Sequence, residues 1–216
     1  MGLKIILTGV TGMVGEGVLL SCLNNPLVGE VLMVNRRSYA LNHPKLKELL
    51  VPDFLKIEQC AEQLKAYDAC FYCAGISSVG LNEKVYSEIT YDTTLHVAKV
   101  LVGSNPNMVL TYVSGSNTDS TEQGKAMWAR VKGKTENALG QLPFKGEYNF
   151  RPGAMLPVNG QKNAKRLYTI AARAIVFFSP KSVLTLDELG TAMVNVVLKG
   201  YPQHNLEIKD IKQLAG

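Results

Sequence analysis

The chain has 216 residues and a formal net charge of +5 at pH 7, from 23 basic and 18 acidic side chains. Apolar residues make up 46% of it and charged residues 19%, which excludes an intrinsically disordered chain and fits one globular domain. No run of 18 apolar residues occurs, and the densest stretch, Ala174–Phe178, is five residues long, so no transmembrane helix is predicted. The N-terminus lacks the basic region of a signal peptide.

The first 35 residues are expected to form a β-α-β unit. Leu3–Leu7 is an apolar run that suits a buried parallel strand. An apolar-periodic helix is predicted from about Met13 to Leu23, before the helix-stopping Asn24-Asn25-Pro26. Val31–Val34 predicts the second strand.

The alternation of helices and strands continues along the chain. The pattern predicts a short helix at about Pro44–Leu50, a weak strand or turn around Val51–Phe54, a helix at Glu58–Leu64, a strand at Asp68–Gly75, a long helix at Glu83–Val102, a strand at Met108–Ser114, a polar loop at Gly115–Gly124, a helix at Met127–Leu139 and a strand at Tyr148–Arg151. It then predicts a helix at Ala164–Phe178, a helix from the capping box at Thr185 to about Lys199, and a last strand at Leu206–Ile211. Such alternation predicts an α/β fold with a parallel sheet and helices on both faces.

The positive charge is concentrated in the second half of the chain. Residues 1–110 hold 9 basic and 10 acidic residues (−1), whereas residues 111–216 hold 14 and 8 (+6). The interval from Tyr148 to Leu186 has no acidic residue and six basic ones: Arg151, Lys162, Lys165, Arg166, Arg173 and Lys181. We interpret this segment, about 151–181, as a solvated basic face or as a site for an anionic ligand.

Two other interpretations of the basic segment are weaker. Nucleic acid is not an expected partner, because no DNA- or RNA-binding motif accompanies the charge. The basic amphipathic stretch Ala164–Phe178 could lie on an anionic membrane surface. An apolar stripe on a helix is more often part of a core or of a dimer interface, so we allow for a homodimer.

The cysteines are expected to be reduced thiols in a cytoplasmic protein. Cys70 and Cys73 have the spacing of a redox or zinc pair, but they fall in a predicted strand, where residues three apart point to opposite faces. No second such pair completes a zinc set, and the three histidines are scattered. We therefore predict no metal site.

The strongest motif follows the first strand and reads Thr8-Gly9-Val10-Thr11-Gly12-Met13-Val14-Gly15. Glycines at such positions permit a tight turn, a close approach of the backbone to a pyrophosphate, and close packing of helix on strand. The helix N-terminus then offers N–H groups to the phosphates. Placed inside a β-α-β unit, the motif predicts a dinucleotide site formed by Gly9, Thr11, Gly12, Met13, Val14 and Gly15.

The end of the second strand predicts which dinucleotide binds. An NAD site usually places Asp or Glu here for the ribose 2′-hydroxyl, and an acid would repel a 2′-phosphate. This chain has Asn35, Arg36 and Arg37 instead. Guanidinium groups bind phosphate, so we expect NADP in preference to NAD.

These motifs resemble the extended and atypical short-chain dehydrogenase/reductase superfamily, and within it the small proteins called NAD-dependent epimerase/dehydratase-like and the Tat-interacting-protein-like oxidoreductases. Besides the glycine motif, the matching segments occur in family order over nearly the whole chain. They are Asn35-Arg36-Arg37, Val51-Pro52-Asp53-Phe54, Cys73-Ala74-Gly75, Val113-Ser114-Gly115-Ser116, Val131-Lys132-Gly133-Lys134-Thr135-Glu136 and Arg151-Pro152-Gly153.

The resemblance implies a single NAD(P)-binding Rossmann domain over residues 1–216, with about 154–205 forming a small lobe on the substrate side. It also implies roles for several residues. Asp53 and Phe54 would flank the adenine, Cys73, Ala74 and Gly75 would line the adenosine side, Pro152 and Gly153 would pass near the nicotinamide, and Lys132 would bind the nicotinamide ribose.

The chain departs from the superfamily's Ser-Tyr-Lys catalytic set at one position. Tyr and Lys are normally four residues apart on one helix, where Lys lowers the pKa of Tyr. Here Lys132 is present, but Trp128 stands at the Tyr position. An indole is a hydrogen-bond donor only and does not exchange protons near neutral pH. The serine is either Ser114 or Ser116, and a replacement phenol could come from Tyr86, Tyr91 or Tyr112.

Two functions remain open at this point. The first is an NADP(H)-binding oxidoreductase or epimerase-like protein in which Lys132, with Ser114 or Ser116, is the remaining polar centre and acts on an unknown small molecule. The second is a non-catalytic protein that senses NADP(H) and acts through a partner.

Overall fold

The computed structural model describes residues 2–164 and 183–216 and contains a seven-stranded sheet in the order β3-β2-β1-β4-β5-β6-β9. The strands are β1 (Leu3–Thr8), β2 (Val28–Asn35), β3 (Leu46–Leu50), β4 (Ala69–Tyr72), β5 (Val109–Val113), β6 (Gly146–Phe150) and β9 (Asn205–Leu206). Every neighbouring pair is parallel. The strand order reverses between β1 and β4, as in the doubly wound Rossmann fold that the sequence predicts.

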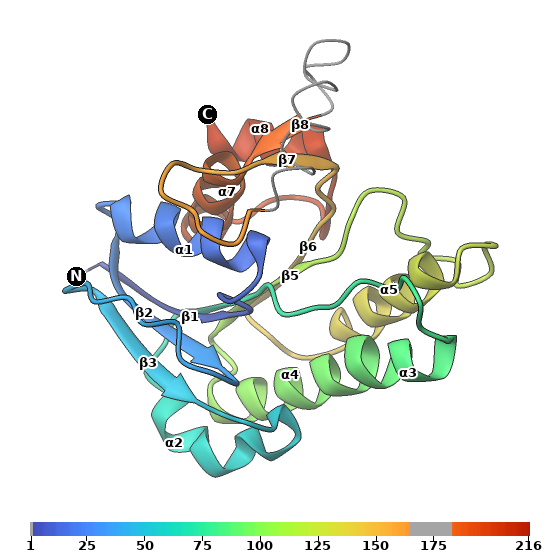
Figure 1. Ribbon diagram of the computed structural model, residues 1–216, viewed down its shortest axis with the longest axis horizontal. Helices are drawn as coiled ribbons and strands as arrows, with labels where there is room; N and C mark the ends of the chain where they lie inside the picture. The colour runs from blue at the N-terminus through green and yellow to red at the C-terminus, as the bar shows by residue number, and fades with distance from the viewer. Residues whose placement is uncertain (1, 165–182) are drawn as a thin grey trace.

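Helices cover both faces of the sheet (Figure 1). One face carries α1 (Met13–Asn24), α7 (Leu186–Lys199) and α8 (Ile208–Ala215), and the other carries α2 (Ala61–Leu64), α3 (Glu83–Ser87), α4 (Thr93–Ser104) and α5 (Met127–Leu139). A 3-10 segment, η1 (Phe54–Cys60), precedes α2, and a π-helical turn, η2 (Glu88–Asp92), joins α3 to α4. The predicted long helix is therefore present, with this turn inside it.

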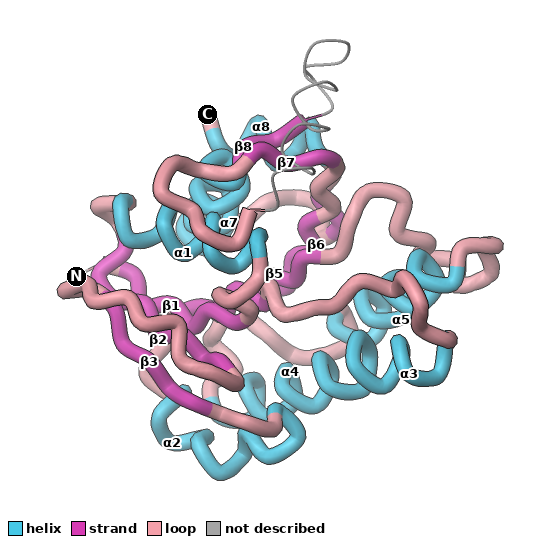
Figure 2. Tube along the Cα trace, in the orientation of Figure 1, coloured by secondary structure: helices cyan, strands magenta, loops and turns pink. Residues whose placement is uncertain are grey.

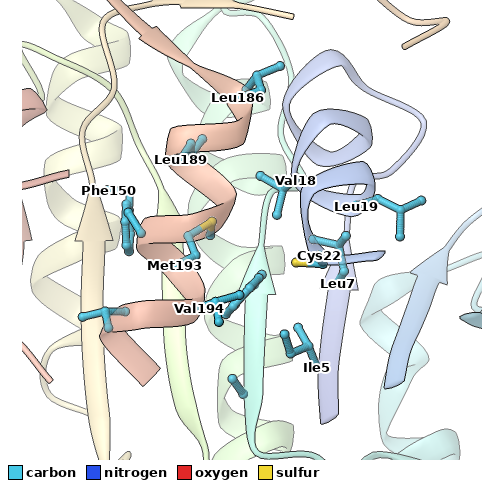
Figure 3. Packing of buried hydrophobic residues seen from close by; sticks show 14 of the residues in the cluster. Ile5, Leu7, Val18, Leu19, Cys22, Phe150, Leu186, Leu189, Met193 and Val194 are labelled. Carbon is cyan, nitrogen blue, oxygen red and sulfur yellow. The ribbon is translucent and has the colours of Figure 1, made fainter. Parts of the chain in front are cut away.

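Alternation along the central strands divides the core into two layers. Ile5 and Leu7 pack with Val18 of α1 and Leu189 of α7 on one face, whereas Ile6 packs on the other. Figure 3 shows the first layer, in which side chains of α1 and α7 meet above β1. Cys70 and Cys73 also lie on opposite sides, as expected for a strand: Cys70 belongs to the second layer and Cys73 packs against the first.

Two predicted elements are wrong. The segment predicted as a helix at Pro44–Leu50 is β3, which pairs with β2 over Val31–Asn35. The predicted strand at Leu206–Ile211 ends after Leu206, and α8 follows. Glu207 and Asp210 form a reciprocal capping box there, which starts the helix.

The C-terminal part of the chain forms a second, two-stranded parallel sheet. It joins β7 (Ala154–Leu156) to β8 (Val183–Thr185), visible beside α7 in Figure 2. The predicted helix at Ala164–Phe178 lies outside the described residues, apart from Ala164. The predicted helix after Thr185 is confirmed as α7, with Thr185 Oγ1 accepting from the Glu188 amide at 3.0 Å. In the ranges that the structure describes, no helix has the length and apolarity that crossing a bilayer requires.

Candidate active site

The glycine motif forms a tight turn between β1 and α1. Gly9 has φ +76°, and a Cβ on it would lie 2.6 Å from the backbone of Cys73 and Ala74. A Cβ on Gly15 would collide with the Gly9 carbonyl oxygen. The Gly12 amide donates to that same oxygen at 2.9 Å. Gly9 therefore brings β1 against β4, and Gly15 brings α1 against the turn, as the motif predicts.

A cavity of about 230 Å³ opens beside this turn. It is lined by Gly9, Thr11, Gly12, Asn35, Arg36, Arg37, Phe54, Cys73, Ala74 and Gly75. Asn35 is 2% exposed, and its Nδ2 has no hydrogen-bond partner among the residues described. A buried amide donor that lacks a partner is costly, so this lining suits a ligand that supplies an acceptor oxygen.

A second cavity, of about 220 Å³, adjoins the first and shares Arg36, Phe54, Ala74 and Gly75 with it. It adds Pro52, Asp53, Leu55, Tyr72, Ile76, Ile89 and Thr93. The Asp53 side chain caps η1 by accepting from the Leu55 amide at 3.0 Å. Asp53 and Phe54 thus border a mainly apolar pocket, which suits a flat aromatic group.

A third cavity, of about 310 Å³, shares Gly12, Cys73, Ala74 and Gly75 with the first. Its other lining residues are Met13, Val14, Ile76, Ser77, Val113, Ser114, Lys132, Pro152 and Met155. We call the three cavities together the crevice. It follows the carboxyl ends of β1, β4 and β5, where ligands of open parallel sheets bind.

Among the residues that the structure describes, Lys132 is the one titratable cation that lines the third cavity. It projects from α5, and its Nζ donates to the backbone oxygen of Ser114 at the end of β5. Burial lowers the pKa of Lys132 to about 8, while the nearby charge of Glu136 acts in the opposite direction. An amine with this pKa exchanges its proton close to physiological pH.

Ser114 also lines the third cavity, but its hydroxyl is engaged. It donates to Glu136 Oε1 at 2.5 Å and lies 3.2 Å from the Phe150 oxygen. Glu136 is 2% exposed and is bound by Arg151, whose Nε donates to Oε1 at 3.0 Å. Arg151 further pairs with Glu207 at 3.2 Å. The polar centre is thus a network of four charged groups around one serine.

Sequence reasoning missed Glu136 and Arg151 as members of this network. Glu136 lies four residues after Lys132 on α5, so the two share a helix face, which is the one signal the sequence offered. Arg151 was counted in the basic segment and quoted in the Arg151-Pro152-Gly153 match, but it was given no role in the site. Its pKa is raised mainly by its hydrogen bond to Glu136.

Several predicted site residues do not line the crevice. Ser116 bonds through its amide to the Pro152 oxygen at 2.9 Å, and Trp128 is half-buried on the first turn of α5. Gly15 and Gly153 likewise fall outside the lining. Between the two serines, the structure brings Ser114 to Lys132.

None of the three tyrosines considered as a replacement phenol lines the crevice. Tyr86 and Tyr112 are buried, and burial raises the pKa of both. The Tyr91 ring lies under Lys134, whose Nζ is 4.4 Å from the ring centroid. Over residues 2–164 and 183–216, no three His, Cys, Asp or Glu side chains come together as a metal site requires.

Comparisons with known proteins agree with this fold. The model of the NAD dependent epimerase/dehydratase family matches residues 5–125, from β1 through the loop after β5. Among curated proteins, the chain is similar to the protein fmp52, mitochondrial, of Emericella nidulans, with 27% identity over 91% of this chain and 88% of that protein.

Solved structures with the same fold are more distant in sequence. The Bordetella bronchiseptica enzyme WbmF in complex with NAD+ has 14% identity and a TM-score of 0.68, covering 99% of this chain and 76% of that one. A short chain dehydrogenase from Burkholderia cenocepacia in complex with NADP has 15% identity and a TM-score of 0.67, covering 98% and 92%.

Proposed function

Because the chain belongs to the NAD-dependent epimerase/dehydratase family, we propose that it binds NADP(H), in preference to NAD(H), and acts as an oxidoreductase of the short-chain dehydrogenase/reductase class. One observation carries the proposal: two cavities that share Gly12, Cys73, Ala74 and Gly75 place Arg36 and Arg37 at one end of the crevice and Lys132 at the other. This order suits a dinucleotide with the 2′-phosphate at the arginines and the nicotinamide at Lys132.

The residues of the crevice have separate tasks. Arg36 and Arg37 bind the 2′-phosphate. The Asn35 side-chain amide, which has no partner among the described residues, donates to the adenosine ribose. The N-terminus of α1 binds the pyrophosphate. Asp53 and Phe54 border the adenine. Pro152 lies at the nicotinamide end, where the dinucleotide would supply or accept a hydride.

Lys132 carries the proton in this proposal. A catalytic Tyr is replaced by Trp128, and Lys132 is the cavity-lining group whose pKa lies near working pH. As an ammonium it donates to a substrate oxygen during reduction, and as an amine it accepts the proton during oxidation. The Ser114 hydroxyl already donates to Glu136, so it offers lone pairs rather than a proton to the cavity.

The hydrogen bond from Ser114 to Glu136 also favours a second candidate function, that of a non-catalytic sensor. With the Ser114 proton committed to Glu136 and Tyr86 and Tyr112 buried away from the crevice, the site has fewer proton donors than a working reductase usually has. A non-catalytic NADP(H) sensor that acts through a partner would need none of them.

Calorimetry with NADPH and NADH tests the binding proposal, and a loss of NADPH absorbance with aldehydes, ketones or nucleotide sugars tests catalysis. Lys132→Met should weaken NADPH binding and abolish turnover, whereas the exposed Lys134→Met should leave both unchanged. Tight NADPH binding without any turnover would favour the sensor, and failure to bind either dinucleotide would refute both functions.

A further inference from the structure

The carboxylate of Glu16 joins three segments that are far apart in the sequence. Glu16 lies on α1, one turn after Gly12, and is 0% exposed. Its Oε1 accepts from the Tyr39 hydroxyl and from the Lys162 amide at 2.8 Å, and its Oε2 accepts from the Asn163 amide at 2.6 Å. Every one of these donors comes from outside α1, so the buried charge is satisfied only while the three segments stay together.

The first of these segments is residues 158–163, which we call the strap. Besides the two amides bound by Glu16, the Gln161 side chain donates to the Met13 backbone oxygen and accepts from the Val158 amide. The strap is thereby fastened to the first turn of α1. Met13, to which the strap is bonded, lines the third cavity of the crevice together with Met155.

The second segment is the loop that carries Arg36 and Arg37. Tyr39 lies two residues after Arg37, and its amide donates to Glu48 of β3 at 2.9 Å. The Ser38 hydroxyl donates to the other oxygen of Glu48 at 2.7 Å. The backbone of this loop is bonded to Glu48 of β3, and the Tyr39 hydroxyl is bonded to Glu16. A displacement of the loop is therefore passed to Glu16 through the rigid ring of Tyr39.

We infer that Glu16 is a positioning residue that couples the Arg36–Arg37 loop to the strap. A phosphate held by the two arginines steadies the loop, Tyr39 then holds Glu16, and Glu16 keeps the strap amides in place beside the nicotinamide end. This inference rests on the proposed binding of NADP(H). It adds a regulatory consequence: the 2′-phosphate, which takes no part in hydride transfer, controls the order of the substrate side of the site.

Hydrogen exchange of the peptide 158–164, measured by mass spectrometry at saturating NADP+ or NAD+, tests the coupling. In the wild-type protein NADP+ should slow exchange of this peptide at least about 5-fold more than NAD+ does, the lower end of common coupling free energies. Tyr39→Phe removes one hydroxyl and should abolish this difference. Tyr67→Phe is the matched control, because the Tyr67 hydroxyl donates to Glu30 at 2.8 Å away from the crevice, and it should behave as wild type.

Thermodynamic reciprocity supplies a second readout. If the 2′-phosphate orders the strap, the strap strengthens NADP+ binding by a similar factor, so Tyr39→Phe should lower the NADP+/NAD+ affinity ratio about 5-fold by calorimetry. Glu16→Gln should lower it at least as far and should speed exchange of the strap in both complexes. Tyr39→Phe carries the test if Glu16→Gln does not fold.

Three outcomes would overturn the inference. In the first, wild-type protein binds NADP+ but the strap exchanges equally in both complexes. In the second, Tyr39→Phe keeps the full difference. In the third, Tyr39→Phe lowers the affinity ratio with no change in strap exchange, which would make Tyr39 a direct phosphate ligand. Calorimetry separates these from failure of the proposed function, in which neither dinucleotide binds.

Discussion

The hydroxyl of Ser114 donates to the buried carboxylate of Glu136 across 2.5 Å, although Ser114 lines the cavity where a substrate would sit. Glu136 is in turn held by Arg151 and shares a helix face with Lys132. The serine is oriented by Glu136 of α5 and by the Phe150 oxygen of β6, which lies 3.2 Å from its hydroxyl. The stability of this network and the chemistry of the site thus depend on the same side chains, those of Ser114, Lys132, Glu136 and Arg151.

Arg151→Ala should destabilise the fold strongly, because it leaves the carboxylate of Glu136 buried without its cation. Breaking one side of such a pair typically costs about 3–5 kcal/mol. Lys47→Ala, which breaks an exposed pair with Glu30, should cost less than about 1 kcal/mol. Urea denaturation of both variants measures the contrast, and equal losses would show that the Arg151 pair is not acting as a buried one.

Arg36→Ala combined with Arg37→Ala should weaken NADPH binding far more than NADH binding. One charge-assisted contact contributes about 1.5–3 kcal/mol, which corresponds to roughly 10- to 150-fold in affinity. Lys56→Ala, a change elsewhere on the surface, controls for the loss of positive charge. Calorimetry that gave equal losses for the two dinucleotides would contradict the preference for NADP.

Gly15→Ala should abolish dinucleotide binding and destabilise the protein, because its Cβ would collide with the backbone of Gly9 in the phosphate turn. Gly103→Ala is the matched control within α4, where a Cβ meets nothing within 4 Å. There the better helix propensity of Ala should raise the free energy of unfolding by up to about 1 kcal/mol. Thermal unfolding measures the stability of both variants, and calorimetry measures their dinucleotide binding. Normal binding by Gly15→Ala would contradict the prediction.

The stability of the protein should depend on pH through Glu147. Glu147 lies in β6 and is 4% exposed, and neither of its oxygens has a hydrogen-bond partner in the described part of the chain. Burial, with a smaller contribution from the charge of Glu136, raises its pKa to about 8, while the neighbouring Asn149 side chain acts in the opposite direction. The folded state thus keeps a proton that the unfolded state releases near pH 4.5, so stability falls as pH rises from about 4.5 to about 8.

Glu147→Gln should remove this loss. At pH 9 the variant should be more stable than wild type by on the order of 3–5 kcal/mol, since each unit of pKa is about 1.4 kcal/mol, and at pH 4.5 the two should match. Exposed Glu62→Gln should give no pH-dependent difference. Urea denaturation at the two pH values is the measurement, and parallel curves for wild type and Glu147→Gln would disprove the shift.

Trp128→Tyr should raise NADPH-dependent reduction of carbonyl compounds. It places a phenol one helical turn before Lys132, where general acid catalysis is worth about 10²–10⁴-fold. Trp128→Phe should bring no gain, and adding Lys132→Met to Trp128→Tyr should remove it. Trp128 itself does not line the crevice, so a flat or lower rate in Trp128→Tyr would mean that a side chain at position 128 does not reach the substrate.

The sequence predicted the parts of the fold whose determinants are local. The glycine turn, the buried runs of β1 and β2, the helix Met127–Leu139 and the capping box at Thr185 depend on neighbouring residues and appear as expected. The segment Leu46–Leu50 was misassigned because pairing with β2, a long-range interaction, overrides its helical spacing.

The candidate site was predicted where it follows from strand order, and missed where it depends on packing. Arg36 and Arg37 reach the crevice because β2 adjoins β1. Glu136, Arg151 and Glu16 make their contacts across 15 or more positions in sequence, and no local pattern distinguishes a buried carboxylate from an exposed one. Glu16 was therefore given no role, and Glu136 was quoted only as the end of the matching segment that begins at Val131.

The two border strands of the seven-stranded sheet, β3 and β9, affect how the protein can associate with other molecules. At one end β9 has only two residues, and at the other β3 carries the exposed charges of Lys47 and Glu48. Short or charged border strands are poor templates for a strand from another chain. Neither border is therefore suited to pair with a strand of another molecule. The sheet should resist the edge-to-edge association that leads to aggregation. Copies of this chain are therefore not expected to pair through either border of the seven-stranded sheet.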